Sequence, residues 1–169
     1  MDKRYDVFKG YSSDLNGHEY VDLGLPSGTL WATCNVGANT PEDYGHYLSW
    51  DEGKTAAANW GNGWRIPTAG QWEEMKKNTK STWTTRNGVN GRLFTANNGN
   101  SFFLPAAGFR TGSSLCEAGD NGYYWSSLFY MGDPPIAFCL YFGSGDCCVK
   151  PYFLYDGRSV RPVCFAPQN

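Results

Sequence analysis

The segment from residue 122 to residue 163 begins with GYYWSS at 122–127 and ends with GRSVRPV at 157–163. Between these ordered ends, residues 128–136, 143–148 and 150–156 mix Tyr and Phe with Gly, Pro, Cys and Asp. No helical period, strand alternation or polar turn composition explains these three stretches. Loops that bind ligands have a similar composition. We therefore expect the function to lie in this segment, as recognition rather than chemistry.

The bulk composition limits the class of protein. The chain has 169 residues, a net charge of -2 and 17% aromatic residues. This length suits one domain with a core, and the charge argues against a basic nucleic-acid-binding face. No apolar run approaches the roughly 18 residues of a membrane span, and residues 1–6 lack the hydrophobic core of a signal peptide. We expect no nucleic-acid partner and no direct membrane insertion.

The rest of the sequence predicts an α+β domain with two helices, short strands and long loops. One helix is expected to begin with Thr40 as N-cap and Pro41 at the first helical position, and to end before Gly53. The other is expected at 68–78, where Thr68 and Gln71 form a capping box, Trp72 and Met75 share a face, and Glu73-Glu74 is solvated. The strands are expected at 18–25, 30–36, 92–96, 101–105, 123–127, about 137–142, about 147–153 and 158–165. Asn98-Gly99 is expected to supply the positive φ angles of the turn between 92–96 and 101–105.

Cysteine and histidine give no clear chemical site. The six cysteines are an even number, but two of them are adjacent and no C-x-x-C pair exists. Cys147-Cys148 could form a vicinal disulfide, although we favour unpaired thiols. His18 and His46 are the two histidines, and neither lies in a metal-binding or general-base motif.

Several motifs, in a fixed order, resemble a paralogous domain of Bacteroides-type gut bacteria. They are residues 18–32, 63–68 followed by Trp72-Glu73, 103–108, 122–127 and 159–163, so the resemblance covers the chain from about 17 to 163. Domains of this kind are similar to the C-type lectin fold and are distant relatives of formylglycine-generating enzymes. Some are the variable proteins of diversity-generating retroelements. The resemblance implies a single C-type lectin-like domain over 1–169, in which two helices pack on short antiparallel strands.

In such retroelements a reverse transcriptase randomises template adenines, so that AAY codons become NNY codons. An NNY codon cannot encode Met, Gln, Lys, Glu or Trp. The irregular stretches, together with Phe138, Cys139, Tyr141 and Arg158, contain only two of these residue types, at Met131 and Lys150. Asn occurs twelve times in residues 1–121 and then only at Asn169. The resemblance therefore implies a variable segment at about 128–158, in which the adjacent cysteines are products of randomisation.

The hypothesis that follows is a non-catalytic ligand-binding module that displays a variable surface on a constant scaffold. Within the segment, Trp125, Ala137, Leu140, Phe142, Val149 and Val160 are expected to hold the fold. Trp31, Trp64 and Trp72 would pack the rest of the frame, and Arg161 would anchor the last strand near the N-terminal one. The residues expected to bind the ligand are Phe129, Tyr130, Met131, Asp133, Phe138, Tyr141, Asp146, Lys150, Tyr152, Phe153, Tyr155, Asp156 and Arg158.

The expected partner is an unknown protein or glycan on another cell or particle, and the expected location is extracellular, on a cell surface or on a phage virion. The calcium-binding loops of sugar-binding C-type lectins are absent. The copper-binding cysteine pair of formylglycine-generating enzymes has no convincing match, because Cys139, Cys147 and Cys148 lie in the irregular segment. We therefore expect no cofactor, no metal and no enzymatic activity. Two alternatives stay open: an adhesin or pilus-tip domain without retroelement diversification, and a formylglycine-generating-type enzyme.

Overall fold

The computed structural model describes residues 12–166, in which two helices lie among twelve mostly antiparallel strands. One sheet has the order β1-β2-β3-β12, with β1 at Ser12–Leu15, β2 at His18–Asp22, β3 at Thr29–Ala32 and β12 at Val163–Phe165. A second has the order β4-β5-β6, with β4 at Thr79–Arg86, β5 at Val89–Ala96 and β6 at Ser101–Pro105. The third has the order β11-β10-β9, with β9 at Gly122–Tyr130, β10 at Ile136–Phe142 and β11 at Cys147–Phe153. A small ribbon pairs β7 (Phe109–Thr111) with β8 (Ser114–Cys116).

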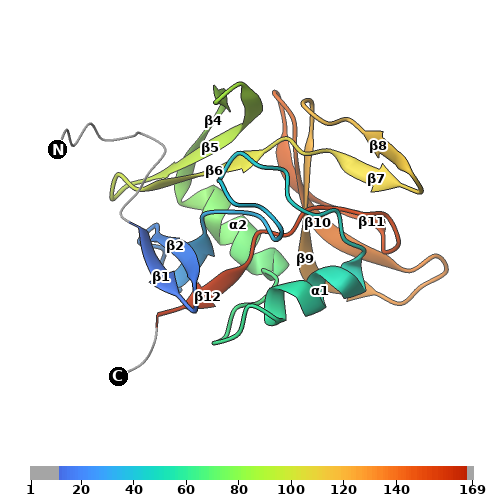
Figure 1. Ribbon diagram of the computed structural model, residues 1–169, viewed down its shortest axis with the longest axis horizontal. Helices are drawn as coiled ribbons and strands as arrows, with labels where there is room; N and C mark the ends of the chain where they lie inside the picture. Colours follow the sequence, from blue (N-terminus) through green and yellow to red (C-terminus); the bar gives the residue numbers. More distant parts are fainter. Residues whose placement is uncertain (1–11, 167–169) are drawn as a thin grey trace.

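The helix α2, at Ala69–Lys77, lies in the centre of the molecule between the three sheets (Figure 1). Its capping box is confirmed, because the Gln71 amide donates to Thr68 Oγ1 at 3.0 Å and the Thr68 amide donates to Gln71 Oε1 at 2.8 Å. Trp72 and Met75 are fully buried, as their shared face predicts. Glu74 is not merely solvated, because it accepts hydrogen bonds from the backbone and the hydroxyl of Ser27 and so ties the turn before β3 to the helix.

The prediction of a helix from Thr40 to residue 52 is wrong. The Asp43 carboxylate accepts the backbone amides of Asn39 and Thr40, which closes a local turn, and Gly45 follows at a φ of +71° that no helix continues. The helix α1 begins later, at Trp50–Ala58. Its capping box joins Ser49 to Glu52. Neither helix in the described part of the chain is long and apolar enough to cross a membrane.

The irregular composition of 128–156 conceals regular strands. Strand β10 pairs with β11 from Ile136↔Phe153 to Phe142↔Cys147 and with β9 on its other side. Ala137 and Cys139 pack in one buried cluster while Leu140 and Phe142 pack in another, so apolar residues point to both faces of β10. A strand buried on both faces loses the alternation by which a half-covered strand is recognised.

One turn differs from the sequence prediction, and one hairpin strand was not predicted. In the loop between β5 and β6 only Gly99 has a positive φ, at +88°, whereas Asn98 does not. Strand β4 was not predicted, and it begins directly after α2. It joins β5 through Asn87-Gly88, where both residues have positive φ, at +48° and +80°. This is the pattern of a two-residue hairpin turn.

Two large buried clusters form the core. The first surrounds Trp31, Trp72 and Tyr124 between the three sheets and α2, and the second surrounds Trp125, Val160 and Trp50 beneath α1. The scaffold residues are as expected: Trp31, Trp72, Trp125, Ala137, Leu140, Phe142 and Val160 are fully buried, Trp64 is 2% exposed, and Val149 packs partly buried against the first cluster.

Arg161 is also fully buried, and it joins segments from distant parts of the chain. Its Nε donates to Asn35 Oδ1 at 2.9 Å and its Nη1 donates to the Ala32 carbonyl at 3.3 Å. Asn35 donates to the Tyr124 hydroxyl at 3.2 Å, which in turn donates to the Pro105 carbonyl at 2.7 Å. The expected anchoring of the last strand near the N-terminal one is therefore confirmed.

We predict that Thr68→Ala lowers the free energy of unfolding by about 1 kcal/mol, because the substitution removes the N-cap acceptor of α2. Urea unfolding followed by circular dichroism measures the change. Thr55→Ala is the matched control, since Thr55 is an exposed residue inside α1, and it should be close to neutral. Equal effects of the two substitutions would contradict a role for the cap.

We predict that Arg161→Lys lowers the free energy of unfolding by about 3 kcal/mol, because an ammonium cannot reach the separate acceptors of a planar guanidinium and leaves buried oxygens unpaired. The same urea titration measures it, with the exposed Arg110→Lys as control. A loss smaller than about 0.5 kcal/mol, the usual range of surface substitutions, would show that the network is dispensable.

Candidate functional site

The third sheet carries most of the residues that the sequence assigns to ligand binding. Because side chains alternate along a strand, the register places them on two opposite faces. Tyr141, Lys150 and Tyr152 share one face with the buried Cys139 and Ala137, whereas Tyr130, Phe138 and Phe153 lie on the other. The thirteen predicted residues therefore do not form one continuous face.

Large exposed apolar side chains gather at the end of this sheet where β9 turns into β10. We call Leu128, Phe129, Tyr130, Met131, Phe153 and Tyr155 the hairpin-end cluster; their exposed fractions are 39%, 40%, 57%, 77%, 55% and 78%. Tyr130 of β9 and Phe153 of β11 lie on either side of Ile136 of β10 in the register, so β9 and β11 contribute to the cluster at the same end of the sheet. Of eight large hydrophobic residues exposed in residues 12–166, six belong to this cluster.

Rings beneath the cluster fix part of it to the scaffold. Phe129 packs on Trp50 of α1 with ring centroids 4.4 Å apart, and Lys54 Nζ lies 4.0 Å from the Trp50 ring centroid. The Trp50 indole donates to the Ser126 carbonyl at 2.9 Å, which holds the ring in place. Tyr130 meets Phe138 edge to face at 5.8 Å. Cation and ring contacts of this kind contribute about 0.5–1 kcal/mol each at exposed sites.

A second group forms what we call the tyrosine strip: Tyr141, Lys150 and Tyr152. Tyr141 donates its hydroxyl to Asn121 Oδ1 at 3.2 Å, and Lys150 Nζ lies 4.6 Å from the Tyr141 ring centroid. Tyr123 lies under both tyrosines, with centroids 5.3 Å from Tyr141 and 5.2 Å from Tyr152. The hydrogen bonds and ring contacts give the strip a fixed arrangement.

The Tyr123 phenol, whose ring packs against Tyr141 and Tyr152, stays neutral. Burial raises the pKa of Tyr123, and the hydrogen bond from its hydroxyl to Glu117 Oε2, 2.9 Å long, raises that pKa further. Burial likewise raises the pKa of Tyr152, against the opposing effect of the Arg158 charge. The Tyr152 hydroxyl of the strip therefore stays neutral.

Arg158 does not belong to the exposed surface, contrary to the sequence prediction. It is 3% exposed, and its guanidinium lies among the rings of Phe109, Tyr123, Trp125 and Tyr152. The chain turns inward at this point because the backbone of residue 158 exchanges two hydrogen bonds of 2.9 Å with Leu48. Asp156, half-buried, pairs with Arg158 Nη2 at 3.5 Å instead of lying free at the rim.

The remaining predicted residues lie in turns. Met131, a member of the hairpin-end cluster, and Asp133 are exposed between β9 and β10. Asp146 is exposed in the turn between β10 and β11, at the opposite end of the strands. Asp146 is therefore separated from the cluster by the length of β10, and a small ligand could not contact both.

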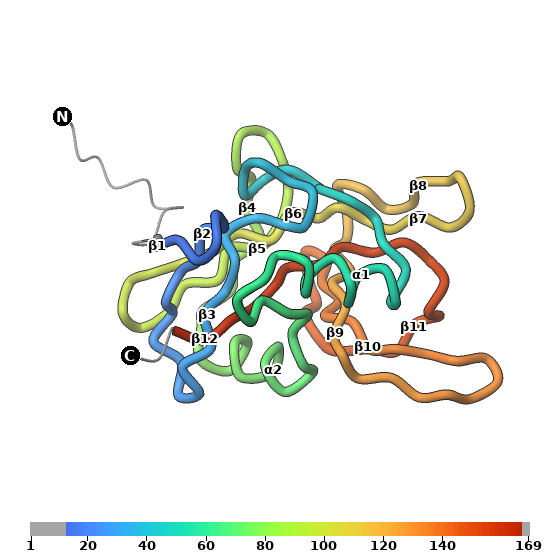
Figure 2. The backbone as a smooth tube through the Cα atoms, turned by 60° about the horizontal axis from the view of Figure 1, so that its bottom comes forward, coloured from blue at the N-terminus to red at the C-terminus, as the bar shows by residue number. Residues whose placement is uncertain are grey.

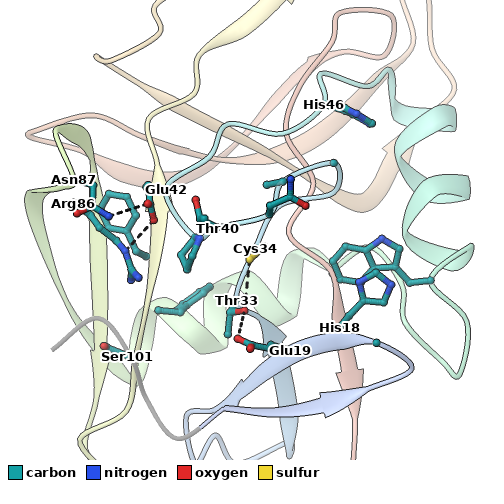
Figure 3. A pocket seen from close by; sticks show the side chains of 18 residues that line it. His18, Glu19, Thr33, Cys34, Thr40, Glu42, His46, Arg86, Asn87 and Ser101 are labelled. Atoms are coloured by element: carbon teal, nitrogen blue, oxygen red, sulfur yellow. Dashed lines mark hydrogen bonds and ion pairs between the residues drawn. The ribbon is translucent and has the colours of Figure 1, made fainter. Parts of the chain in front are cut away.

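A cavity of about 950 Å³ lies elsewhere, among β2, the segment after β3, the β4–β5 turn and β6 (Figure 3). Figures 1 and 2 place β1 and β2 at one end of the molecule and the β9–β10 turn at the other. In the cavity Glu42 pairs with Arg86 at 3.1 Å and accepts from Asn87 at 2.9 Å. Burial acts to raise the pKa of Glu42, but these partners outweigh it and leave that pKa lowered.

The two histidines line this cavity without forming a metal-binding group. His18 stacks on Trp60 at 3.7 Å, and burial lowers its pKa against the opposing charge of Asp14. Within residues 12–166 no three His, Cys, Asp or Glu side chains come together as metal ligands. All six cysteines are free thiols, so Cys147 and Cys148 are not joined in a vicinal disulfide. Burial raises the pKa of the Cys139 thiol, which is fully enclosed.

The sequence reasoning missed three members of the site: Trp50, Lys54 and Leu128. The signal for the first two is the Ser49-x-x-Glu52 capping box, which fixes the start of α1 and places Trp50 and Lys54 four residues apart on one helix face. Leu128 was part of the irregular segment, but a single leucine carries no sign of exposure.

Comparison of the chain with protein-family models, curated proteins and solved structures finds no match.

Proposed function

We propose that the protein is a non-catalytic binding module that recognises a macromolecular partner through the hairpin-end cluster and the adjoining tyrosine strip. The single observation that carries this proposal is the gathering of six exposed, large apolar side chains at one end of the third sheet. A concentration of exposed apolar side chains at one end of a domain is typical of an interaction site. Tyr, Phe and Met are also the residue types that supply contact area at protein interfaces.

The rigidity under this surface supports recognition by a preformed site. Phe129 packs on Trp50, Tyr130 meets Phe138, and the strip lies on Tyr123. A ligand therefore meets side chains whose conformational freedom is already reduced. Binding then loses less entropy than it would on flexible loops.

The free edge of β11 argues for contact through side chains rather than through an added strand. In the described chain β11 pairs only with β10. Gly143 donates to the Asp146 carbonyl, so these two residues form a hydrogen-bonded pair. Hydrogen-bonded and non-hydrogen-bonded pairs alternate along antiparallel strands, and this alternation makes Phe138 and Pro151 a non-hydrogen-bonded pair. The Pro151 nitrogen therefore points away from β10. Pro151 thus removes a donor from the outer edge, and its neighbour Lys150 adds a charge there. Both features discourage pairing with another strand.

The module we propose has a C-type lectin-like fold and is a variable protein of a diversity-generating retroelement. Two helices packed among short antiparallel strands with long connections agree with that resemblance. All members of the hairpin-end cluster fall within 128–158, the segment expected to vary, while the residues expected to be constant are buried. The partner would be a protein or glycan on another cell or particle, met at an extracellular surface or on a virion.

The non-catalytic part of the proposal rests on the thiols. Cys139 is fully buried with a raised pKa, and Cys147 is partly buried with a pKa that burial also raises. Thiols that stay protonated are poor nucleophiles and poor copper ligands. The opposite would be needed for an oxidase of the formylglycine-generating type.

We predict that the combined variant Tyr130→Ser, Met131→Ser, Phe153→Ser and Tyr155→Ser folds normally and loses binding. The four side chains are exposed, so the free energy of unfolding should fall by less than about 2 kcal/mol in total. Affinity for a partner captured with the wild-type chain from a bacterial cell-surface extract should fall at least about thirtyfold, measured by biolayer interferometry.

The matched control for this variant replaces four exposed residues of other elements, Lys80, Thr82, Thr85 and Asn97, by Ser. This control should bind like the wild type. Unchanged affinity in the cluster variant, or an equal loss in the control, would contradict the proposed surface.

The retroelement origin predicts a codon pattern in the gene. The codons of Phe129, Tyr130, Asp133, Phe153 and Tyr155 should align with AAY codons in a nearby template repeat, while the codons of the buried residues Trp125 and Leu140 should match the template. Sequencing the flanking DNA checks this. A gene without a template repeat and a reverse-transcriptase gene nearby would favour a domain of fixed sequence, and would leave the binding surface itself to the affinity measurement.

A further inference from the structure

Arg158 is enclosed by aromatic rings to an unusual degree. Its guanidinium carbon lies 4.3 Å from the centroid of Tyr152, 4.7 Å from those of Phe109 and Tyr123, and 5.5 Å from that of Trp125. These rings come from β7, β9 and β11, three strands that do not all pair with one another. The cation is therefore the common neighbour of rings that the sheet hydrogen bonds alone do not hold together.

Hydrogen bonding explains little of how Arg158 is held. Its one ion pair, from Nη2 to Asp156 Oδ2, is 3.5 Å long. The Nε and Nη1 atoms are buried and have no hydrogen-bond partner among residues 12–166. Burying a cation with unpaired donors is costly, and attraction to aromatic faces is the contact that remains to offset it. A guanidinium is suited to this role because it is planar and weakly hydrated, so rings can stack on it.

The rings around Arg158 lead directly to the tyrosine strip. Tyr152 is both a ring of the enclosure and a half-exposed member of the strip. Tyr123, another ring of the enclosure, supports Tyr141 at 5.3 Å, and Tyr141 in turn carries Lys150. Tyr152 is thus one contact away from the guanidinium, Tyr141 two and Lys150 three.

We propose that Arg158 is the positioning residue of the tyrosine strip: its buried guanidinium fixes the orientations of Tyr152 and Tyr123, and through Tyr123 that of Tyr141. The role of these ordered rings in ligand binding rests on the proposed function, whereas the packing of the rings around Arg158 is independent of it. The residue acts from below and does not touch the ligand. Although Arg158 lies at the end of the segment expected to vary, this role requires it to stay constant.

The proposal separates ring order from stability. Arg158→Met removes a buried cation and with it the desolvation cost of that charge. Asp156, the carboxylate that loses its partner, is 24% exposed and is therefore partly hydrated. A residue that merely filled the core would act in the opposite way, since its loss would lower the stability of the whole domain. Arg158→Met should therefore keep the melting temperature while it loosens the rings.

The experiment measures tyrosine ring flips by NMR on the full chain labelled with ¹³C-tyrosine, without any ligand. We expect Arg158→Met to increase the flip rates of Tyr152 and Tyr123 at least about tenfold, the loss expected when a desolvated cation–ring contact is removed. Arg158→Lys should have a similar effect, because an ammonium retains the charge but not the planar stacking. Tyr152→Phe and Tyr123→Phe assign the signals, and thermal unfolding of every variant is measured alongside.

Two control variants sharpen this test. Arg65→Met removes an arginine that lies over Phe165, outside the enclosure, and should leave the strip unchanged. Asp156→Asn removes the ion pair but keeps the guanidinium, and should also leave the ring flips unchanged. Loosening of the rings by Asp156→Asn to the same extent would assign the role to the ion pair and overturn the proposal.

Two further results would overturn it. Ring flips at the wild-type rate in Arg158→Met and Arg158→Lys would show that the strands alone order the tyrosines. Unfolding of both variants would show that Arg158 supports the fold rather than the strip. Failure to find a partner for the hairpin-end cluster would refute the proposed function but would leave the ring measurement unaffected, so the two outcomes can be told apart.

Discussion

The buried Arg161 guanidinium is the constraint on which the rest of the structure depends. It donates to Asn35 and to the Ala32 carbonyl, and Asn35 continues to Tyr124 and Pro105. The C-terminal segment, the long connection after β3, strand β9 and the end of β6 thus meet at one polar centre inside an apolar core. Buried polar groups are tolerated only where their partners are in place. The network therefore specifies one arrangement of the three sheets in a way that apolar packing alone, which tolerates many arrangements, would not.

This arrangement explains why the third sheet exposes its large apolar side chains mainly at one end. Strand β10 is covered by α2 on one face and by the segment 154–160 with α1 on the other, so Ala137, Cys139, Leu140 and Phe142 are all enclosed. The strands extend beyond this cover at the β9–β10 turn (Figure 1). The large side chains at that turn are exposed. Exposure is thus set by the lengths of the strands relative to their cover, rather than by the residue types in them.

The sequence predicted the elements whose signals are local. The capping box of α2, the buried tryptophans and the β5–β6 hairpin are all present, because caps, periodicity and turns depend on neighbours in the chain. The first helix was misplaced because a Thr-Pro-Glu-Asp start resembles a cap, while the competing turn depends on how the Asp43 side chain folds back. The prediction of the binding residues was only partly correct, for a related reason. Tyr130, Met131, Phe153 and Tyr155 are exposed, but composition alone could not show that Arg158 turns inward, since its burial follows from long-range pairing with Leu48.

Arg158 and Arg161 are three residues apart, yet the protein holds them by opposite means. Arg161 is held by oxygen acceptors and joins the sheets, so its contribution is to the fold. The Arg158 guanidinium has one ion pair and contacts four aromatic rings, so its contribution is to the orientation of the side chains that pack on it. Two separate supports allow the surface to change without loss of the scaffold, since no residue of the strip or the hairpin-end cluster supplies a hydrogen bond of the Arg161 network. A module that must present different residues on one fold requires this independence, and a fixed adhesin does not.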